Sequence, residues 1–246
     1  MKTKLFAAAC AALAIFTSCA GLFDFDEPII EDDNTVPIKD GNTLTYGNHQ
    51  YTLDETLSLD GGSATITFTH FPATIREFTF LQSQLLGTSQ PGTLALNLMA
   101  FEMFRRDRTK GQKCIEKCNL SVNAKSVISN LRQKFPEERG AEITDSYMQP
   151  YLVATFLAGA TEANKYQPEY PYKFTFTYNT SAYKQQGEYS TSFFGHIYHW
   201  LTTRGGNKDY DATVIDPDDD DIILVHGCSN YYLAAPPVTG WEDTLK

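Results

Sequence analysis

The sequence predicts an α+β fold with a mostly antiparallel sheet and a central cluster of helices. Residues 64–69 and 172–178 alternate between apolar and polar side chains, which is typical of half-buried strands. Between these segments, apolar residues recur every three or four positions, as on one face of a helix. Strands, then helices, then strands again, without regular βαβ alternation, indicate an antiparallel sheet.

The folded part is expected to begin near Thr43 with a small antiparallel meander. Residues 44–46 and 50–52 flank Gly47-Asn48, a two-residue turn signal between alternating segments. The strand at 64–69 then continues this meander.

Three helices are predicted in the middle of the chain. The first covers residues 93–108, where leucine, methionine and phenylalanine form an apolar stripe and two arginines suit the carboxyl end. A short helix around residues 112–118 follows. The third covers residues 124–135 and is ended by Pro136.

Strands return in the last third of the chain. Besides residues 172–178, the segments 192–201, 213–215 and 222–232 are rich in β-branched and aromatic residues. We therefore expect one α+β domain over residues 43–246.

The first part of the chain, residues 1–18, has the features of an export signal. Lys2 and Lys4 precede an uncharged apolar run of 12 residues, at positions 5–16. This run is too short for a membrane-spanning helix, which needs about 20 residues. We expect the segment to be removed.

Residues 16–19, Phe-Thr-Ser-Cys, resemble the lipobox of bacterial lipoproteins. The resemblance implies cleavage before Cys19 and attachment of fatty chains, palmitate among them, to that residue. Stable anchoring takes about two lipid signals, which such a modification supplies. The expected place is therefore the cell envelope, as an outer membrane lipoprotein on the periplasmic face or at the cell surface. An ordinary secretory signal that happens to contain Cys19 is the alternative.

Residues 19–42 are predicted to be an acidic tether. Acids and prolines dominate this stretch, which favours an extended chain without a core. Acids soon after a lipidated cysteine resemble the export signals of surface lipoproteins in gut commensal Gram-negative bacteria. The tether would hold the domain away from the membrane.

The overall charge argues against nucleic acid as a partner. The chain has 30 acidic and 20 basic residues, a formal net charge of −10, and no basic tract. Phosphate backbones require clustered Lys and Arg. We therefore expect no nucleic acid, and membrane contact through the lipid anchor alone.

Four residues with metal-ligand chemistry lie near the carboxyl end: His196, His199, His226 and Cys228. Strand positions three apart point to opposite faces, so the first two would not share an ion. The acids at 216–221 lack the spacing of a calcium loop and are interpreted as a solvated loop, with weak calcium binding as the alternative. We predict no metal and no cofactor.

Three cysteines remain beyond the leader: Cys114, Cys118 and Cys228. The first two lie one helical turn apart, where Cβ atoms are about 5–6 Å from each other, and a disulfide needs about 3.5–4.5 Å. Three free buried thiols are expected, with a bridge from one of them to Cys228 as the alternative.

Tyr178, Tyr198 and Trp200 are the residues predicted to bind a ligand, because aromatic rings with a polar end suit binding surfaces. The chain has no nucleophile elbow, phosphate loop, zinc-protease motif or dinucleotide fingerprint. A non-enzymatic module that binds a glycan or an envelope protein is the preferred hypothesis. A glycan-directed hydrolase with unrecognised carboxylates and an accessory subunit of an envelope complex are the alternatives.

Residues 159–168, Gly-Ala-Thr-Glu-Ala-Asn-Lys-Tyr-Gln-Pro, resemble a pattern in an uncharacterised family of bacterial proteins, often from gut species. The family pattern has a proline after the threonine, where this chain has Glu162. Tyr231 and Tyr232 stand near the place of a family tryptophan. The resemblance supports the fold class and implies no activity. From the residues themselves, we expect a rigid loop in which Gly159 and Asn164 shape the turn, with a binding loop as the alternative.

Overall fold

A computed structural model describes residues 33–58, 60–137, 147–180, 190–191, 197–206, 208–215, 222–233 and 236–246. Cys19, the leader, His196 and the acids at 216–221 lie outside these residues. Within them, no helix is both long enough and apolar enough to span a lipid bilayer.

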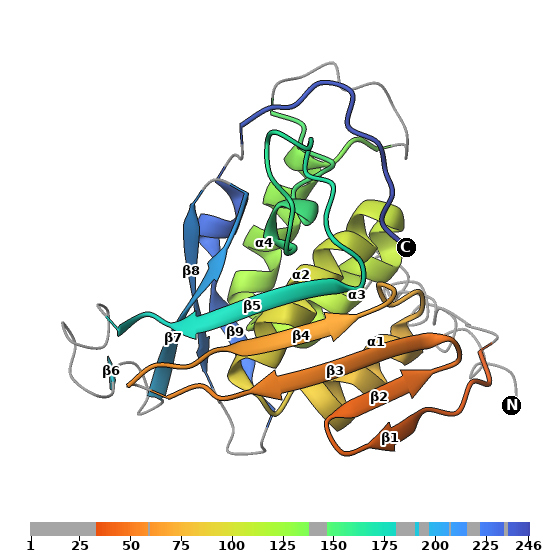
Figure 1. Cartoon of the computed structure of the whole chain (residues 1–246), viewed down its shortest axis with the longest axis vertical. Helices are drawn as coiled ribbons and strands as arrows, with labels where there is room; N and C mark the ends of the chain where they lie inside the picture. The colour runs from red at the N-terminus through yellow and green to blue at the C-terminus, as the bar shows by residue number, and fades with distance from the viewer. Residues whose placement is uncertain are drawn as a thin grey trace, which may run out of the picture. The chain divides into compact units, whose positions relative to one another are not determined.

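Nine described strands form one sheet in which every pair is antiparallel (Figure 1). The order is β1-β2-β3-β4-β5-β7-β8-β9, and β6 pairs with β7 beside β5. The strands are β1 (Ile38–Asp40), β2 (Thr43–Tyr46), β3 (His49–Glu55), β4 (Ala64–Phe68), β5 (Tyr172–Tyr178), β6 (Ser190–Thr191), β7 (Ile197–Arg204), β8 (Asp209–Ile215) and β9 (Leu224–Gly227). Strand β1 falls within the stretch predicted as a tether.

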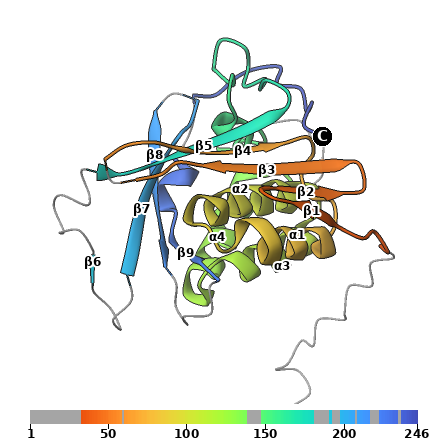
Figure 2. The same ribbon diagram turned by 60° about the horizontal axis from the view of Figure 1, so that its bottom comes forward.

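The helices come from the middle of the chain and lie against one face of the sheet (Figure 2). The α+β class and the antiparallel sheet are confirmed, and the helices form a layer against one face of the sheet (Figure 2). They are α1 (Ile75–Leu81), a π-helical turn η1 (Gln82–Leu86), α2 (Gln90–Arg106), α3 (Arg108–Cys118) and α4 (Ser121–Lys134). Two 3₁₀ turns follow later, η2 (Ala154–Phe156) and η3 (Ser229–Tyr232).

Helix α2 is the centre of the core. Residues 91–105 of this helix are all buried, and it contacts β4, β5, β8 and β9. Ser89 caps its start by accepting from Gly92 N at 3.3 Å, and Pro91 stands in its first turn, where a missing N–H costs nothing. The helix thus begins at Gln90, three residues before the predicted start.

A buried carboxylate on α2 joins the helix to the C-terminal segment. Glu102 is fully buried and accepts two hydrogen bonds from Arg105, at 2.8 and 2.6 Å, and one from Arg106 at 2.7 Å. Arg105 also donates to Asp243 at 3.0 Å. Because every charge in this group has an opposite partner, the attraction between the partners offsets part of the desolvation penalty of burial.

Two predictions of secondary structure were incomplete. The segment 222–232 was expected to be one strand, but β9 ends at Gly227 and η3 follows it. Residues 75–86, which form α1 and η1, were not predicted to be helical. Thr74 caps α1 by accepting from Glu77 N at 3.1 Å, a local signal that the sequence does contain.

Candidate functional site

Strand β5 has two different neighbours along one edge. Its C-terminal half pairs with β7 through residues 176–178. Where β7 ends, the loop at 157–160 takes its place, and Ala158 N donates to Lys173 O at 3.0 Å. This loop belongs to the segment that rises above β5 in Figure 1. A pocket opens between the loop and the β7–β8 turn.

The pocket has a volume of about 330 Å³ and combines three segments of the chain. They are residues 155–161, two residues of β5, and residues 204–206. Its lining includes two basic side chains, Lys173 and Arg204, and no acidic one. The pocket therefore gathers positive charge in a chain whose net charge is −10.

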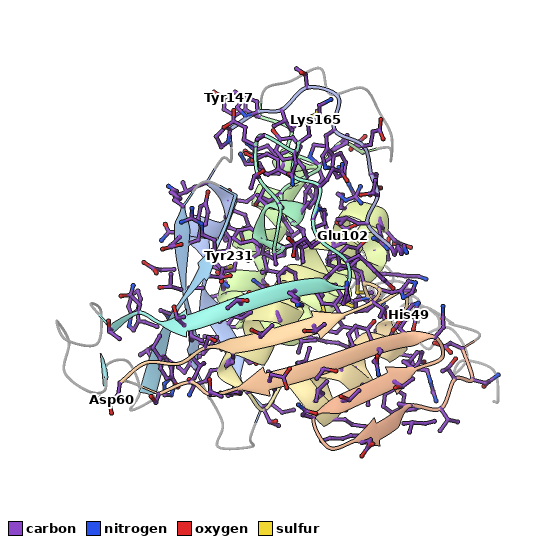
Figure 3. The ribbon with its side chains drawn as sticks, in the orientation of Figure 1. His49, Asp60, Glu102, Tyr147, Lys165 and Tyr231 are labelled. Atoms are coloured by element: carbon purple, nitrogen blue, oxygen red, sulfur yellow. The ribbon has the colours of Figure 1, made fainter. Side chains whose placement is uncertain are left out.

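The loop at 159–168 is held in shape by Asn164. Its Oδ1 accepts from Thr161 N at 2.8 Å and from Gln167 N at 3.2 Å, and its Nδ2 donates to Gly159 O at 2.7 Å. Gly159 has φ +80°, which favours glycine. Lys165 lies beside the C-terminal segment in Figure 3. The expected roles of Gly159 and Asn164 are confirmed.

The opposite wall of the pocket depends on two glycines in the β7–β8 turn. A Cβ at Gly205 would come within 2.2 Å of the Tyr210 ring, and one at Gly206 within 2.4 Å of the Tyr166 ring. Tyr166 is fully buried and donates from its hydroxyl to Pro236 O at 3.0 Å. The wall thus packs main chain directly on two tyrosine rings, which makes it rigid.

Polar and aromatic side chains continue from the pocket along the sheet face opposite the helices. On β5 three exposed residues alternate with buried ones. On β7 the half-buried Trp200 and Thr202 and the exposed Arg204 alternate with the buried Leu201 and Thr203. Thr177 pairs with Thr202, which brings the two rows side by side. We call these side chains the outer track: Lys173, Thr175, Thr177, Trp200, Thr202 and Arg204. At roughly 3.3 Å per residue, each row is about 13 Å long.

The hydrogen bonds and ion pairs of the outer-track residues leave several of their polar groups open to solvent. Arg204 pairs with Asp209 at 3.2 Å, with both side chains mostly exposed. Thr202 donates to Asp211 at 2.6 Å. Among the described residues, Lys173 has no ion pair. An exposed ion pair such as that of Arg204 is weak and exchanges readily with other anions.

The track ends at an aromatic group on β7, β8 and β9. Tyr198 lies on the same face as Trp200, and its ring meets that of His226 edge to face, at 4.5 Å between centroids. The register shift in β8–β9 leaves His226 as an extra residue, the arrangement of a β-bulge. Burial lowers the pKa of His226. The bulge turns this imidazole toward Tyr198 and Thr213, to whose hydroxyl its Nδ1 lies at 3.3 Å.

The three residues predicted to bind a ligand are divided between the two faces of the sheet. Tyr198 and Trp200 share the outer face. Tyr178 pairs with the buried Leu201, packs against the core on the helix side, and donates to Gln90 Oε1 at 2.7 Å. The pocket and its two basic residues were not predicted, because they come together only through the fold.

A family described as "Domain of unknown function (DUF6935)" matches residues 70–234. The chain belongs to this family. The expected membership of a family without a known activity is thus confirmed. The DUF6935 match contains the whole pocket and the whole outer track. No curated protein and no solved structure matches the chain.

Within the DUF6935 region, the residues considered as metal ligands are separated. His226 is exposed on the outer face, while His199 pairs with Val214 on the helix side and Cys228 is buried in the core. Burial lowers the pKa of His199. Among the described residues, no three His, Cys, Asp or Glu side chains come together as a metal site would require.

The three cysteines of the DUF6935 region are free and buried, as the preferred hypothesis for them states. Burial raises the pKa of Cys118 well above its usual value, and the neighbouring Cys114 and Cys228 raise it further. Burial also raises the pKa of Cys228. These thiols belong to the core rather than to a reactive site.

A second polar cluster surrounds Glu77 in α1, near the start of the DUF6935 match. The carboxylate is 1% exposed. Its Oε1 atom lies 2.7 Å from His49 Nδ1 and accepts a hydrogen bond from the Tyr51 hydroxyl at 2.7 Å. Its Oε2 atom accepts one from Ala73 N at 2.8 Å. His70 stacks on His49 with ring centroids 4.3 Å apart. Because two of these bonds connect β3 to α1 and the third fixes the segment just before α1, the cluster has a structural role.

Proposed function

We propose that this DUF6935 protein is a lipid-anchored envelope protein that binds a glycan along the outer track. The observation that carries the proposal is the continuity of the pocket with the track. A glycan needs hydrogen-bonding groups together with an aromatic ring on a rigid surface. Thr175, Thr177 and Trp200 offer these groups on neighbouring strands.

The rigidity of the track supports binding without a large ordering cost. Both rows are on paired strands, and the pocket walls are held by Asn164 on one side and by glycine–tyrosine contacts on the other. Ligand groups that meet a preformed surface lose less free energy to the ordering of the protein. The site would thus recognise an extended ligand that lies on the sheet.

The lipid anchor is inferred from the leader sequence, and a separate experiment tests it. Cells expressing the full chain are labelled with palmitate, and the protein is recovered from membranes. We expect label on the wild type and none on Cys19→Ala, which should remain unprocessed or soluble. Palmitate on the Cys19→Ala variant would refute the anchor.

Glycan binding is tested with the mature chain on a glycan array, followed by calorimetry on the hits. Thr177→Arg should abolish binding, because a long side chain would cross the middle of the track. Gln50→Arg is the matched control, since Gln50 is also exposed on the outer face, on β3. Equal binding by both variants, or no binding by the wild type to any glycan, would contradict the proposal.

Hydrolysis is the second candidate, for one reason. Asp209 and Asp211 lie on the outer face of β8, paired with Arg204 and Thr202, about 7 Å apart along the strand. That separation falls within the range of paired carboxylates in glycosidases. Hydrolysis would be supported if the wild type released reducing ends from a bound glycan and Asp211→Asn did not. If the wild type released no reducing ends, the protein would bind the glycan without cleaving it.

A further inference from the structure

We infer that the glycan carries an anionic group, a carboxylate or a sulfate ester, which binds in the pocket between Lys173 and Arg204. This inference rests on the proposed function and specifies its ligand. It starts from the composition of the pocket lining, which holds two basic side chains and no acidic one. In a chain with 30 acidic and 20 basic residues, such a lining favours an anion.

The acidic residues around the pocket neutralise this charge only in part. Asp209 pairs with Arg204 from the next strand, and both side chains are mostly exposed. Glu169 packs its side chain over Gly159, where a Cβ would come within 2.5 Å of its Cγ, but it is not part of the lining. Lys173 has no ion pair among the described residues.

The two cations differ in what they can offer an anion. Arg204 presents a planar fork of donors that matches a carboxylate or a sulfate, whereas Lys173 supplies a compact charge. An anion that binds Arg204 need only replace a weak, solvent-exposed partner, Asp209.

Lys173 and Arg204 also stand at one end of the outer track. An acidic sugar seated in the pocket would therefore leave its neighbouring sugars to lie along Thr175 and Thr177 toward Trp200. This orientation predicts that one acidic sugar of the bound segment occupies the pocket.

The test compares charged and neutral probes on the mature chain. Polygalacturonate, alginate, chondroitin sulfate and heparan sulfate form the acidic set, and starch, xylan, dextran and galactomannan form the neutral set. For each acidic hit, a carboxyl-reduced or a desulfated form of the same polymer shows which group is bound. We expect binding to the acidic set, lost when the responsible group is removed, and weakened as salt rises from about 0.05 M to about 0.5 M.

Variants then assign the binding to the pocket. Lys173→Gln and Arg204→Gln should each weaken binding by roughly fivefold, and the double variant by more than tenfold. Lys173→Arg should retain it. The matched control is Lys117→Gln with Lys125→Gln, two exposed lysines on α3 and α4. Circular dichroism and melting curves check that every variant is folded.

The outcomes separate this inference from the proposed function. One outcome is that neutral glycans bind as well as acidic ones, with binding abolished by Thr177→Arg but not by the charge variants. In that case the inference of an anionic ligand is wrong, and the proposal of glycan binding along the outer track stands. If the control pair weakens binding as much as the pocket variants do, the anion is held by general charge, and the pocket assignment is wrong. If no glycan of either set binds, both proposals fail.

Discussion

The main chain of Gly206 lies against the ring of Tyr166, so closely that a Cβ at 206 would come within 2.4 Å of its Cε1 atom. Tyr166 is fully buried, has φ +55°, and stacks on Tyr151 with ring centroids 5.2 Å apart. The glycine of one turn and the tyrosine of a distant loop therefore pack directly on each other, and Gly206 lines the pocket.

Replacement of this glycine should disturb both stability and binding. We expect Gly206→Ala to lower the free energy of unfolding by about 1–3 kcal/mol, because the added methyl group displaces a buried ring. Urea denaturation measures the loss. Gly41→Ala is the control: it has open space around its Cβ and φ +55°, so it should cost stability through backbone strain and leave glycan binding unchanged. A Gly206→Ala protein as stable as the wild type would contradict the contact.

Glu77 should be a costly polar residue to neutralise. The change Glu77→Gln leaves His49, Tyr51 and the Ala73 amide with a weaker acceptor in a buried place. We expect a loss of about 2–3 kcal/mol in unfolding free energy at neutral pH. Glu137→Gln should be nearly neutral, since its side chain is 88% exposed and has one contact, to Arg108, at 3.4 Å. A similar small effect for both variants would show that the cluster is not stabilising.

Acid should destabilise the domain through its histidines. Burial lowers the pKa of His70, His199 and His226 below 6.5, and His49 adds to the shift of His70. The unfolded chain then binds protons before the folded one does, so stability falls as pH drops through about 6.5. Urea titrations between about pH 8 and pH 5 should show this slope, and His70→Gln should reduce it. A stability that rises on acidification would refute the assignment.

The three thiols should be unreactive in the native protein. Cys114, Cys118 and Cys228 are all buried, and burial raises the pKa of the last two, so little thiolate is present at neutral pH. We expect thiol reagents to modify them only at the rate of unfolding, and fully in denaturant. Mass spectrometry after a short native exposure gives the count. Rapid modification of any of the three would mean that the core opens there.

The regular elements could be predicted because their signals are local. The alternation at 172–178 matches β5 residue for residue, and the apolar stripe beginning near Leu94 identified α2. The turn at Gly47-Asn48 joins β2 to β3 as predicted. In each case, a few neighbouring side chains determine which face is buried.

The site could be predicted only in part, because its pieces are distant in the sequence. The alternation in β7 correctly grouped Tyr198 with Trp200, but the register with β5 decides that Tyr178 faces the helices. Nothing local to Lys173 or Arg204 shows that the fold brings them to one pocket. Their proximity depends on β7 ending where the loop at 157–160 begins to follow β5.

The sheet extends beyond the limits of the DUF6935 match, and this has a practical consequence. Strand β4, which covers the edge of β5, lies before residue 70. Asp243 and Lys246, which bind Arg105 and Tyr172, lie after residue 234. A fragment expressed with those limits would present the unpaired edge of β5, and its Arg105 would keep Glu102 but lose Asp243. Such a fragment should aggregate, so the cooperative folding unit is wider than the region by which the family is recognised.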